Sequence, residues 1–170
     1  MVEGKKVGVL IACAAVFILL SASTGGVGWS NYEALLDGGS VELKMGLFRS
    51  CRTEKSFSTF SISNICSDFK SEQLSSKHKA IQAFMILSVL ASIAAVVCVM
   101  FIDKISAKLI SWLMIDAFIS ALIGLAIFTE SKENSIIDIY DYGWAYALGW
   151  VGAIAALIVG VVVSVAYGSS

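Results

Sequence analysis

The chain has 170 residues, of which 58% are hydrophobic and 15% are charged, and its mean hydropathy is +0.84. This composition is too apolar for an ordinary soluble domain, whose surface needs more charge. The formal net charge of -1, without a dense block of lysine or arginine, excludes a broadly basic nucleic-acid-binding protein. The sequence therefore predicts an integral membrane protein.

Four apolar segments stand out along the chain, at about residues 7–29, 80–102, 109–128 and 144–167. Each is close to the ~20 residues that a helix needs to cross a ~30 Å hydrocarbon core. Helices satisfy their own backbone hydrogen bonds inside a lipid bilayer, so a closed barrel is not needed. We therefore expect an all-α transmembrane four-helix bundle, with residues 1–170 forming a single domain.

The loops between these segments are very uneven. The loop at about residues 30–79 holds most of the non-membrane mass, and the loop at about residues 129–143 lies on the same side of the membrane. Within the long loop, residues 41–47 alternate between apolar and other side chains, which predicts a half-buried strand. A second short strand is expected from Phe60 to Cys66. Two such strands alone would be marginal, so we expect a small antiparallel sheet that rests on the bundle.

Two cysteines indicate which side the long loop occupies. Cys51 and Cys66 lie fifteen positions apart in its polar part, and such a pair persists as a disulfide in an oxidising compartment. A zinc site would need further ligands, and His78 is the only histidine, so metal binding is not expected. We therefore place the long loop outside the cell and both termini in the cytoplasm.

The basic residues give a mixed indication of orientation. Several lysines beside predicted helix ends favour a cytoplasmic N-terminus under the positive-inside rule; they are Lys5, Lys6, Lys104 and Lys108. The long loop nevertheless holds seven basic residues, including Lys77 and Lys79 beside a helix, and this count favours the opposite orientation. Six acidic residues share the loop, so the cysteines carry more weight.

The order of residues in the long loop resembles a family signature. Trp29, Gly46, Leu47, Phe48, Cys51 and Cys66 follow the claudin first-loop pattern W…GLW…C…C, with Phe48 in place of the second tryptophan. "AIQAFMILS" (80–88) and "DYGWAYALGWVGA" (141–153) are similar to the starts of the second and fourth helices of the epithelial membrane proteins and peripheral myelin protein. The chain thus resembles the claudin, peripheral myelin protein and epithelial membrane protein superfamily.

The resemblance implies a claudin-like fold, with an extracellular antiparallel sheet of about five strands beside the bundle. Four strands would come from the first loop and one from the second. It also implies that the bridge between Cys51 and Cys66 joins neighbouring strands. Trp29, Leu47 and Phe48 would pack the base of the sheet against the outer leaflet.

An acidic residue lies within the third predicted helix. A carboxyl at the depth of Asp116 costs roughly 2.5 to 3.5 kcal/mol on insertion scales if it faces lipid, so we expect it to face inward. Trp112, Asp116, Ser120 and Gly124 recur every four positions, which favours a hydrogen bond from this stripe to another helix. An ion pathway or docking of a partner is the alternative.

Small residues recur along the fourth predicted helix: Gly152, Ala156, Gly160 and Ser164. Such a ridge lets another helix approach closely. Packing inside the bundle is the first interpretation, and docking onto a second membrane protein is the alternative.

The resemblance implies a cell–cell adhesion or paracellular barrier protein of the plasma membrane, and of cell junctions in particular. It would act through its sheet and through association with itself, side by side and across cells, and the charges of Arg49, Arg52, Lys55 and Asp68 would bias which ions pass. The alternative is an auxiliary subunit of an ion channel or receptor. Catalysis has no support, because His78 has no evident nucleophile partner, and no cofactor or small-molecule substrate is expected.

Overall fold

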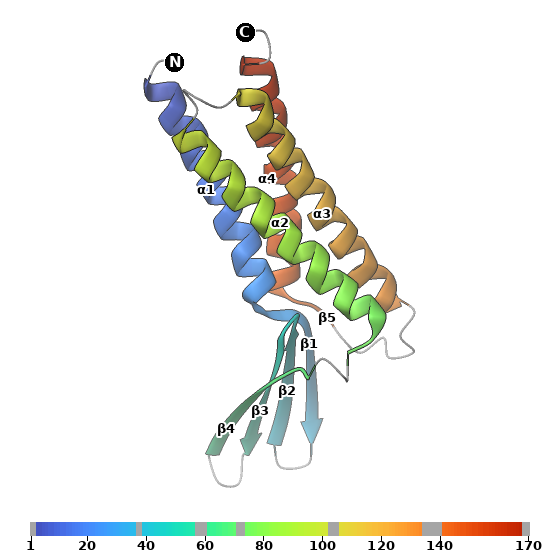
Figure 1. The fold of residues 1–170 in the computed structure, drawn as a ribbon. Helices are drawn as coiled ribbons and strands as arrows, with labels where there is room; N and C mark the ends of the chain where they lie inside the picture. Colours follow the sequence, from blue (N-terminus) through green and yellow to red (C-terminus); the bar gives the residue numbers. More distant parts are fainter. Residues whose placement is uncertain are drawn as a thin grey trace.

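The computed structural model describes residues 3–36, 39–56, 61–70, 74–101, 106–133 and 141–167. Its helices are α1 (Glu3–Gly25), α2 (Ser76–Met100), α3 (Ala107–Glu133) and α4 (Trp144–Tyr167), and each contains a stretch long and apolar enough to cross a membrane. They lie side by side, with a sheet at one end of the bundle and both chain termini at the other (Figure 1). The expected four-helix bundle is confirmed.

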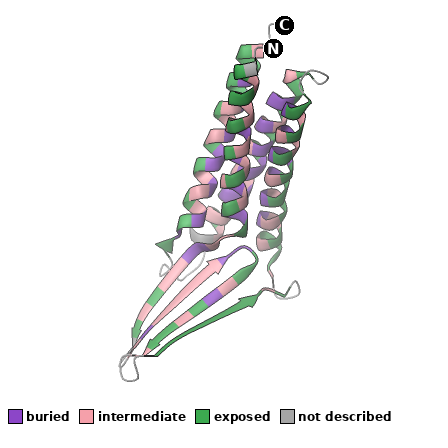
Figure 2. Ribbon diagram, turned by 90° about the vertical axis from the view of Figure 1, so that its left-hand side faces the viewer, coloured by how far each residue is buried: buried purple, intermediate pink, exposed green. Residues whose placement is uncertain are grey.

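The helices pack in a closed ring, in which α1 contacts α2 and α4, and α3 contacts α2 and α4. Small side chains such as Ala95, Ala121 and Ala153 are fully buried between them. Small residues let helix backbones approach closely, which supplies the van der Waals contact that holds helices together in lipid. Exposed positions lie along the helices (Figure 2). They include large aliphatic side chains such as Leu90 and Val151, so the bundle presents an apolar surface to the bilayer.

The sheet has five antiparallel strands in the order β4-β3-β2-β1-β5. The strands are β1 (Val27–Leu36), β2 (Gly39–Gly46), β3 (Arg49–Ser56), β4 (Ser61–Asp68) and β5 (Asp141–Tyr142). Four come from the first loop and β5 comes from the second, which confirms the sheet that the resemblance implies. The alternating pattern at residues 41–47 corresponds to β2, and the second expected strand corresponds to β4, although Phe60 lies outside the described residues.

The first helix ends earlier than its hydropathy predicts. α1 stops at Gly25, and Trp29, which we expected at the end of this helix, lies in β1. Gly28 has a φ of 148°, which side chains with a Cβ rarely adopt, and an added Cβ would lie 2.5 Å from Nε1 of Trp144. Glycine here lets the chain leave the helix and enter the sheet directly. Other boundaries differ as well: α1 and α2 each begin four residues before the predicted starts at 7 and 80, and α3 continues to Glu133, beyond the predicted end at residue 128.

Candidate functional site

The disulfide joins the two strands at one side of the sheet. Cys51 of β3 and Cys66 of β4 are partners in the strand register, and their sulfur atoms are bonded. The predicted disulfide is therefore confirmed. It closes a loop with a sequence separation of 15, which contributes about 3 kcal/mol in the chain-entropy model. The bridge makes the β3-β4 hairpin a stable unit.

Trp29 anchors the base of the sheet in the helix bundle. Its side chain is only 1% exposed, and its indole Nε1 donates a hydrogen bond of 2.7 Å to the carbonyl oxygen of Ser23 in α1. Its ring centroid lies 4.9 Å from that of Phe128 in α3 and 6.0 Å from that of Tyr146 in α4, both edge-on. One side chain of β1 thus contacts three helices, which fixes where the sheet meets the membrane.

The turn between β2 and β3 forms a second connection between the sheet and the bundle. Leu47 is 1% exposed, and its carbonyl oxygen lies 2.7 Å from Nε2 of His78 and 2.6 Å from Nε2 of Gln82, both on α2. These contacts of His78 and Gln82 span 31 and 35 positions, so no local sequence pattern indicates them. Phe48 is 38% exposed, so it packs less fully at this base than expected.

Charged side chains lie on the exposed hairpin. Arg49 and Asp68 are partners in the register of β3 and β4, with 3.6 Å between Nε and Oδ1, and Arg52 lies 2.6 Å from Glu54. Lys55 is exposed and makes no ion pair with the residues that the structure describes. Exposed ion pairs contribute little stability, about 0 to 1 kcal/mol each. These charges therefore define the surface of the hairpin more than they stabilise it. Within the described ranges, no three His, Cys, Asp or Glu side chains are grouped to hold a metal ion.

Trp29, the Gly46-Leu47-Phe48 turn and the disulfide together form the junction that the claudin signature implies. The chain matches the PMP-22/EMP/MP20/Claudin family over residues 6–163, which include all five strands and most of the four-helix bundle. The chain belongs to this family. Members of the family are membrane proteins and not enzymes, so this chain is a multi-pass membrane protein whose helices contact lipid.

Individual relatives agree with the family match. Epithelial membrane protein 1 of Homo sapiens is 28% identical over 166 residues, which cover 91% of this chain and 91% of the relative. The protein of the same name from Pongo abelii gives the same values. Epithelial membrane protein 1 of Oryctolagus cuniculus is 28% identical over 130 residues, which cover 72% of this chain and 75% of the relative.

In this member of the PMP-22/EMP/MP20/Claudin family, β4 forms an open edge of the sheet. All eight of its residues are exposed, including Ile62 at 72% and Ile65 at 64%. It pairs with β3 on one side, and among the strands that the structure describes none lies on its other side. Edge strands are commonly protected by lysine or proline, and the sequence SISNICSD contains neither. This edge is therefore open to pairing with another strand.

Asp116 faces out of the bundle, so the expectation that it faces inward is wrong. Asp116 is exposed and Trp112 is 70% exposed, whereas Ser120 is 7% exposed. Gly124 is buried against Met85 of α2. Residues spaced four apart are rotated by about 40° around the helix axis at each step. Over the three steps from Trp112 to Gly124 the side-chain direction therefore turns from the outer face of the bundle to the inner face. The stripe is thus divided, and the carboxyl of Asp116 lies on the surface that meets lipid or a neighbouring helix.

Most of the small-residue ridge on α4 is occupied inside the bundle. A Cβ added at Gly152 would lie 3.0 Å from Leu20 of α1, and one added at Gly160 would lie 3.1 Å from Ile115 of α3. Ala156 is fully buried. Docking onto a second protein is therefore not the use of these three positions, because helices of the same chain already fill the space. Ser164 is exposed and does not share their environment.

Proposed function

We propose that this chain is a claudin-like adhesion or barrier protein that associates with copies of itself, side by side in one membrane and head to head across two. The observation that carries this proposal is the open edge of β4 on a sheet that is fixed to the bundle. Such an edge offers backbone donors and acceptors to a matching strand. Copies joined in this way form rows of sheets that seal or line the space between cells.

The proposed orientation places the sheet outside the cell and both termini in the cytoplasm. We place the protein in the plasma membrane where two cells touch. The disulfide supports this orientation, because disulfides persist in oxidising compartments. Lys5 and Lys108 lie at the helix ends away from the sheet, as the positive-inside rule requires. Lys77 and Lys79 lie at the sheet end, where Glu130 balances the charge of Lys77 at 2.9 Å and Lys79 is exposed. The disulfide therefore carries more weight for the orientation than the lysines do.

The proposed barrier is mainly steric, because most charges on the hairpin are balanced locally. Arg49 pairs with Asp68, and Arg52 pairs with Glu54. Lys55 then leaves a small positive bias on the exposed hairpin. We therefore expect weak discrimination against small cations.

The side-by-side association also uses the outer face of α3. An exposed carboxyl in hydrocarbon costs roughly 2.5 to 3.5 kcal/mol on insertion scales. A hydrogen-bond donor on a neighbouring helix offsets part of this cost, and the exposed ring of Trp112 adds contact area next to Asp116.

The test is to express fluorescent full-length protein in cells that form no junctions of their own. We expect enrichment where two expressing cells touch, and not where an expressing cell touches a non-expressing one. Ile65→Glu places a charge on the β4 edge opposite Arg52, its partner in the register, which keeps the hairpin paired. Leu35→Glu is the matched control, because Leu35 is a similarly exposed aliphatic residue on β1.

We expect Ile65→Glu to reduce the enrichment and Leu35→Glu to preserve it. Equal enrichment in the two variants would contradict a role for the β4 edge. Purification in a mild detergent tests the wider proposal: homo-oligomers support it, whereas a fixed ratio with one channel or receptor would replace it with the auxiliary-subunit function.

A further inference from the structure

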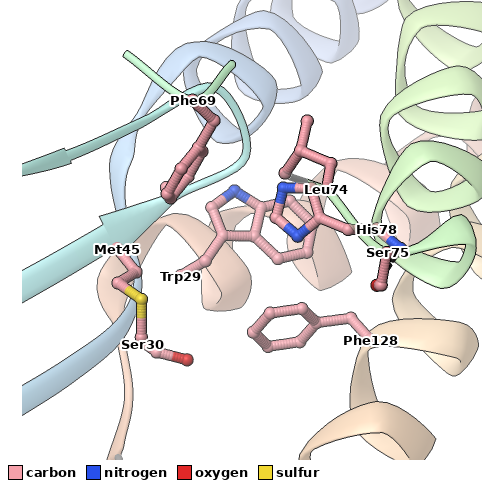
Figure 3. Close-up of a pocket in the computed structure, with 9 residues that line it drawn as sticks. Trp29, Ser30, Met45, Phe69, Leu74, Ser75, His78 and Phe128 are labelled. Atoms are coloured by element: carbon pink, nitrogen blue, oxygen red, sulfur yellow. Dashed lines mark hydrogen bonds between the residues drawn. The ribbon is translucent and has the colours of Figure 1, made fainter. Parts of the chain in front are cut away.

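A cavity of about 380 Å³ lies where the sheet meets the helices. Its walls come from the base of β1 and β2, from Phe69 after β4, from Leu74, Ser75 and His78 at the start of α2, and from α3 (Figure 3). The first turn of α2 and the last part of α3 are ends of the stretches that are long and apolar enough to cross a membrane, and we therefore infer that the cavity lies at the level of the lipid headgroups. Its volume falls within the range of about 300 to 1,000 Å³ that is typical of small-molecule sites.

The cavity walls are held in place by contacts with the rest of the protein. Trp29 is fixed by its hydrogen bond to Ser23 and by the ring of Phe128. His78 is fixed by the carbonyl oxygen of Leu47. The ring of Phe69 packs edge-on against His78, with 5.6 Å between centroids. Because these side chains are already engaged, they do not collapse into the space, and the cavity is preformed.

The chemistry of the lining favours a neutral ligand. Aromatic and aliphatic side chains provide most of the surface, and none of the lining residues carries a carboxylate, an ammonium or a guanidinium group. A charged headgroup would therefore be buried without a counter-charge, which is unfavourable. Hydrogen-bonding groups come from Ser30, Ser75 and His78. The hydroxyl of Ser75 accepts a hydrogen bond from the backbone N–H of His78, and its own O–H remains available to donate.

We propose that this cavity binds a neutral lipid that carries a hydroxyl group and enters from the leaflet bordering the sheet. The hydrocarbon body would pack against Trp29, Met45 and Phe128, and the hydroxyl group would bond to the polar side chains of the lining. Sterols and monoacylglycerols share this chemistry. A bound lipid fills the space between the sheet and the bundle, so it stiffens the junction that orients the sheet.

The test uses the full-length protein in phosphatidylcholine nanodiscs with two photoreactive probes, diazirine-labelled cholesterol and a diazirine-labelled monoacylglycerol. Mass spectrometry locates the crosslinks. We expect at least one probe to label the cavity at Met45, Leu74 or His78, with saturation and with competition by the same lipid without the label. Labelling by cholesterol alone assigns a sterol, and labelling by the monoacylglycerol alone assigns an acylglycerol. Labelling by both probes shows that the cavity recognises the hydroxyl group on a sterol and on an acylglycerol alike.

A cavity-filling variant and a matched control complete the experiment. Met45→Trp fills the cavity, whereas Leu43→Trp makes the same kind of change two residues away on the same face of β2, outside the lining. We expect labelling to fall about tenfold or more in Met45→Trp, which corresponds to about 1.4 kcal/mol, and to persist in Leu43→Trp. If the Met45→Trp variant misfolds, seen as aggregation or as loss of the bond between Cys51 and Cys66, the variant Ser30→Leu is used to fill the cavity instead.

Three results would overturn the proposal. One is the absence of saturable cavity labelling by both probes. Another is equal labelling of the cavity by diazirine-labelled phosphatidylcholine. The third is undiminished labelling in a folded variant with a filled cavity.

Discussion

Nε2 of His78 lies 2.7 Å from the carbonyl oxygen of Leu47 and ties the turn between β2 and β3 to the first turn of α2. A carbonyl oxygen is only an acceptor, so the imidazole carries a proton on Nε2. The side-chain amide of Gln82, one turn further along α2, donates to the same oxygen at 2.6 Å. This second connection between the sheet and the bundle therefore depends on one backbone oxygen with two side-chain donors.

The shared acceptor predicts that the two donors are not independent. His78→Ala or Gln82→Ala alone leaves one donor in place, and we expect each to cost about 0.5 to 1.5 kcal/mol. The double variant leaves the oxygen without a side-chain donor, so its cost should exceed the sum of the single costs. Thermal unfolding in detergent measures the three changes, with the exposed Lys79→Ala as control. Strict additivity would contradict the shared role.

Removing the disulfide should have two separate effects: a loss of stability of the sheet, and, where one cysteine remains, a reactive free thiol. We expect removal of both cysteines in the double variant Cys51→Ser, Cys66→Ser to destabilise the sheet by about 3 kcal/mol. Cys51→Ser alone leaves the thiol of Cys66 on an exposed strand, so we expect additional disulfide-linked dimers on non-reducing gels. The double variant should show no such dimers at this site. Dimers of equal intensity in both variants would assign the crosslink to other cysteines.

Hydropathy and alternation were sufficient to predict the elements whose environment is uniform along their length. Each of the four helices contains a long apolar stretch, and residues 41–46 of β2 alternate between apolar and other side chains. The end of α1 was misplaced because Val27 and Trp29 continue the apolar pattern after the helix has ended at Gly25. Val27 is half-buried in β1, and Trp29 is buried against α1, α3 and α4 at the base of the sheet. Hydropathy does not distinguish burial at this junction from burial in the membrane.

The sequence predicts the site residues whose role follows from their residue type or from a signature, and not those whose role depends on a contact made by the fold. Cys51 and Cys66 form the predicted bond, and Trp29 fits the family signature. The roles of His78 and Gln82 depend on a contact across more than thirty positions, which no local pattern reveals. The direction of Asp116 depends on the rotation of α3 against its neighbours, which a spacing of four residues does not fix.

The backbone at Gly46, the last residue of β2, packs so closely that a single added methyl group should lower the stability of the protein. A Cβ at Gly46 would lie 2.5 Å from the carbonyl oxygen of Gly26 and 3.1 Å from Cα of Val27, so the backbone must shift. We expect Gly46→Ala to cost about 1 to 3 kcal/mol. The control is Gly8→Ala in α1, where an added Cβ meets nothing within 4 Å and where alanine favours the helix by about 0.5 to 1 kcal/mol. If thermal unfolding of Gly46→Ala matches that of the native chain, the end of β2 does not approach Gly26 and Val27 this closely.

Substitutions of Asp116 on the outer face of α3 test whether its carboxyl contacts a neighbouring helix or only lipid. If Asp116 bonds to a neighbouring helix, Asp116→Leu should weaken association within one membrane, measured by energy transfer between labelled copies in a bilayer. Asp116→Asn keeps a side chain that can hydrogen-bond, so it should retain most of the association. Ile119→Leu, also exposed on α3, controls for changes in lipid packing. If the carboxyl meets only lipid, Asp116→Leu should leave the energy transfer unchanged and ease membrane insertion by roughly 2.5 to 3.5 kcal/mol. That result would remove α3 from the proposed interface and leave the β4 edge as its basis.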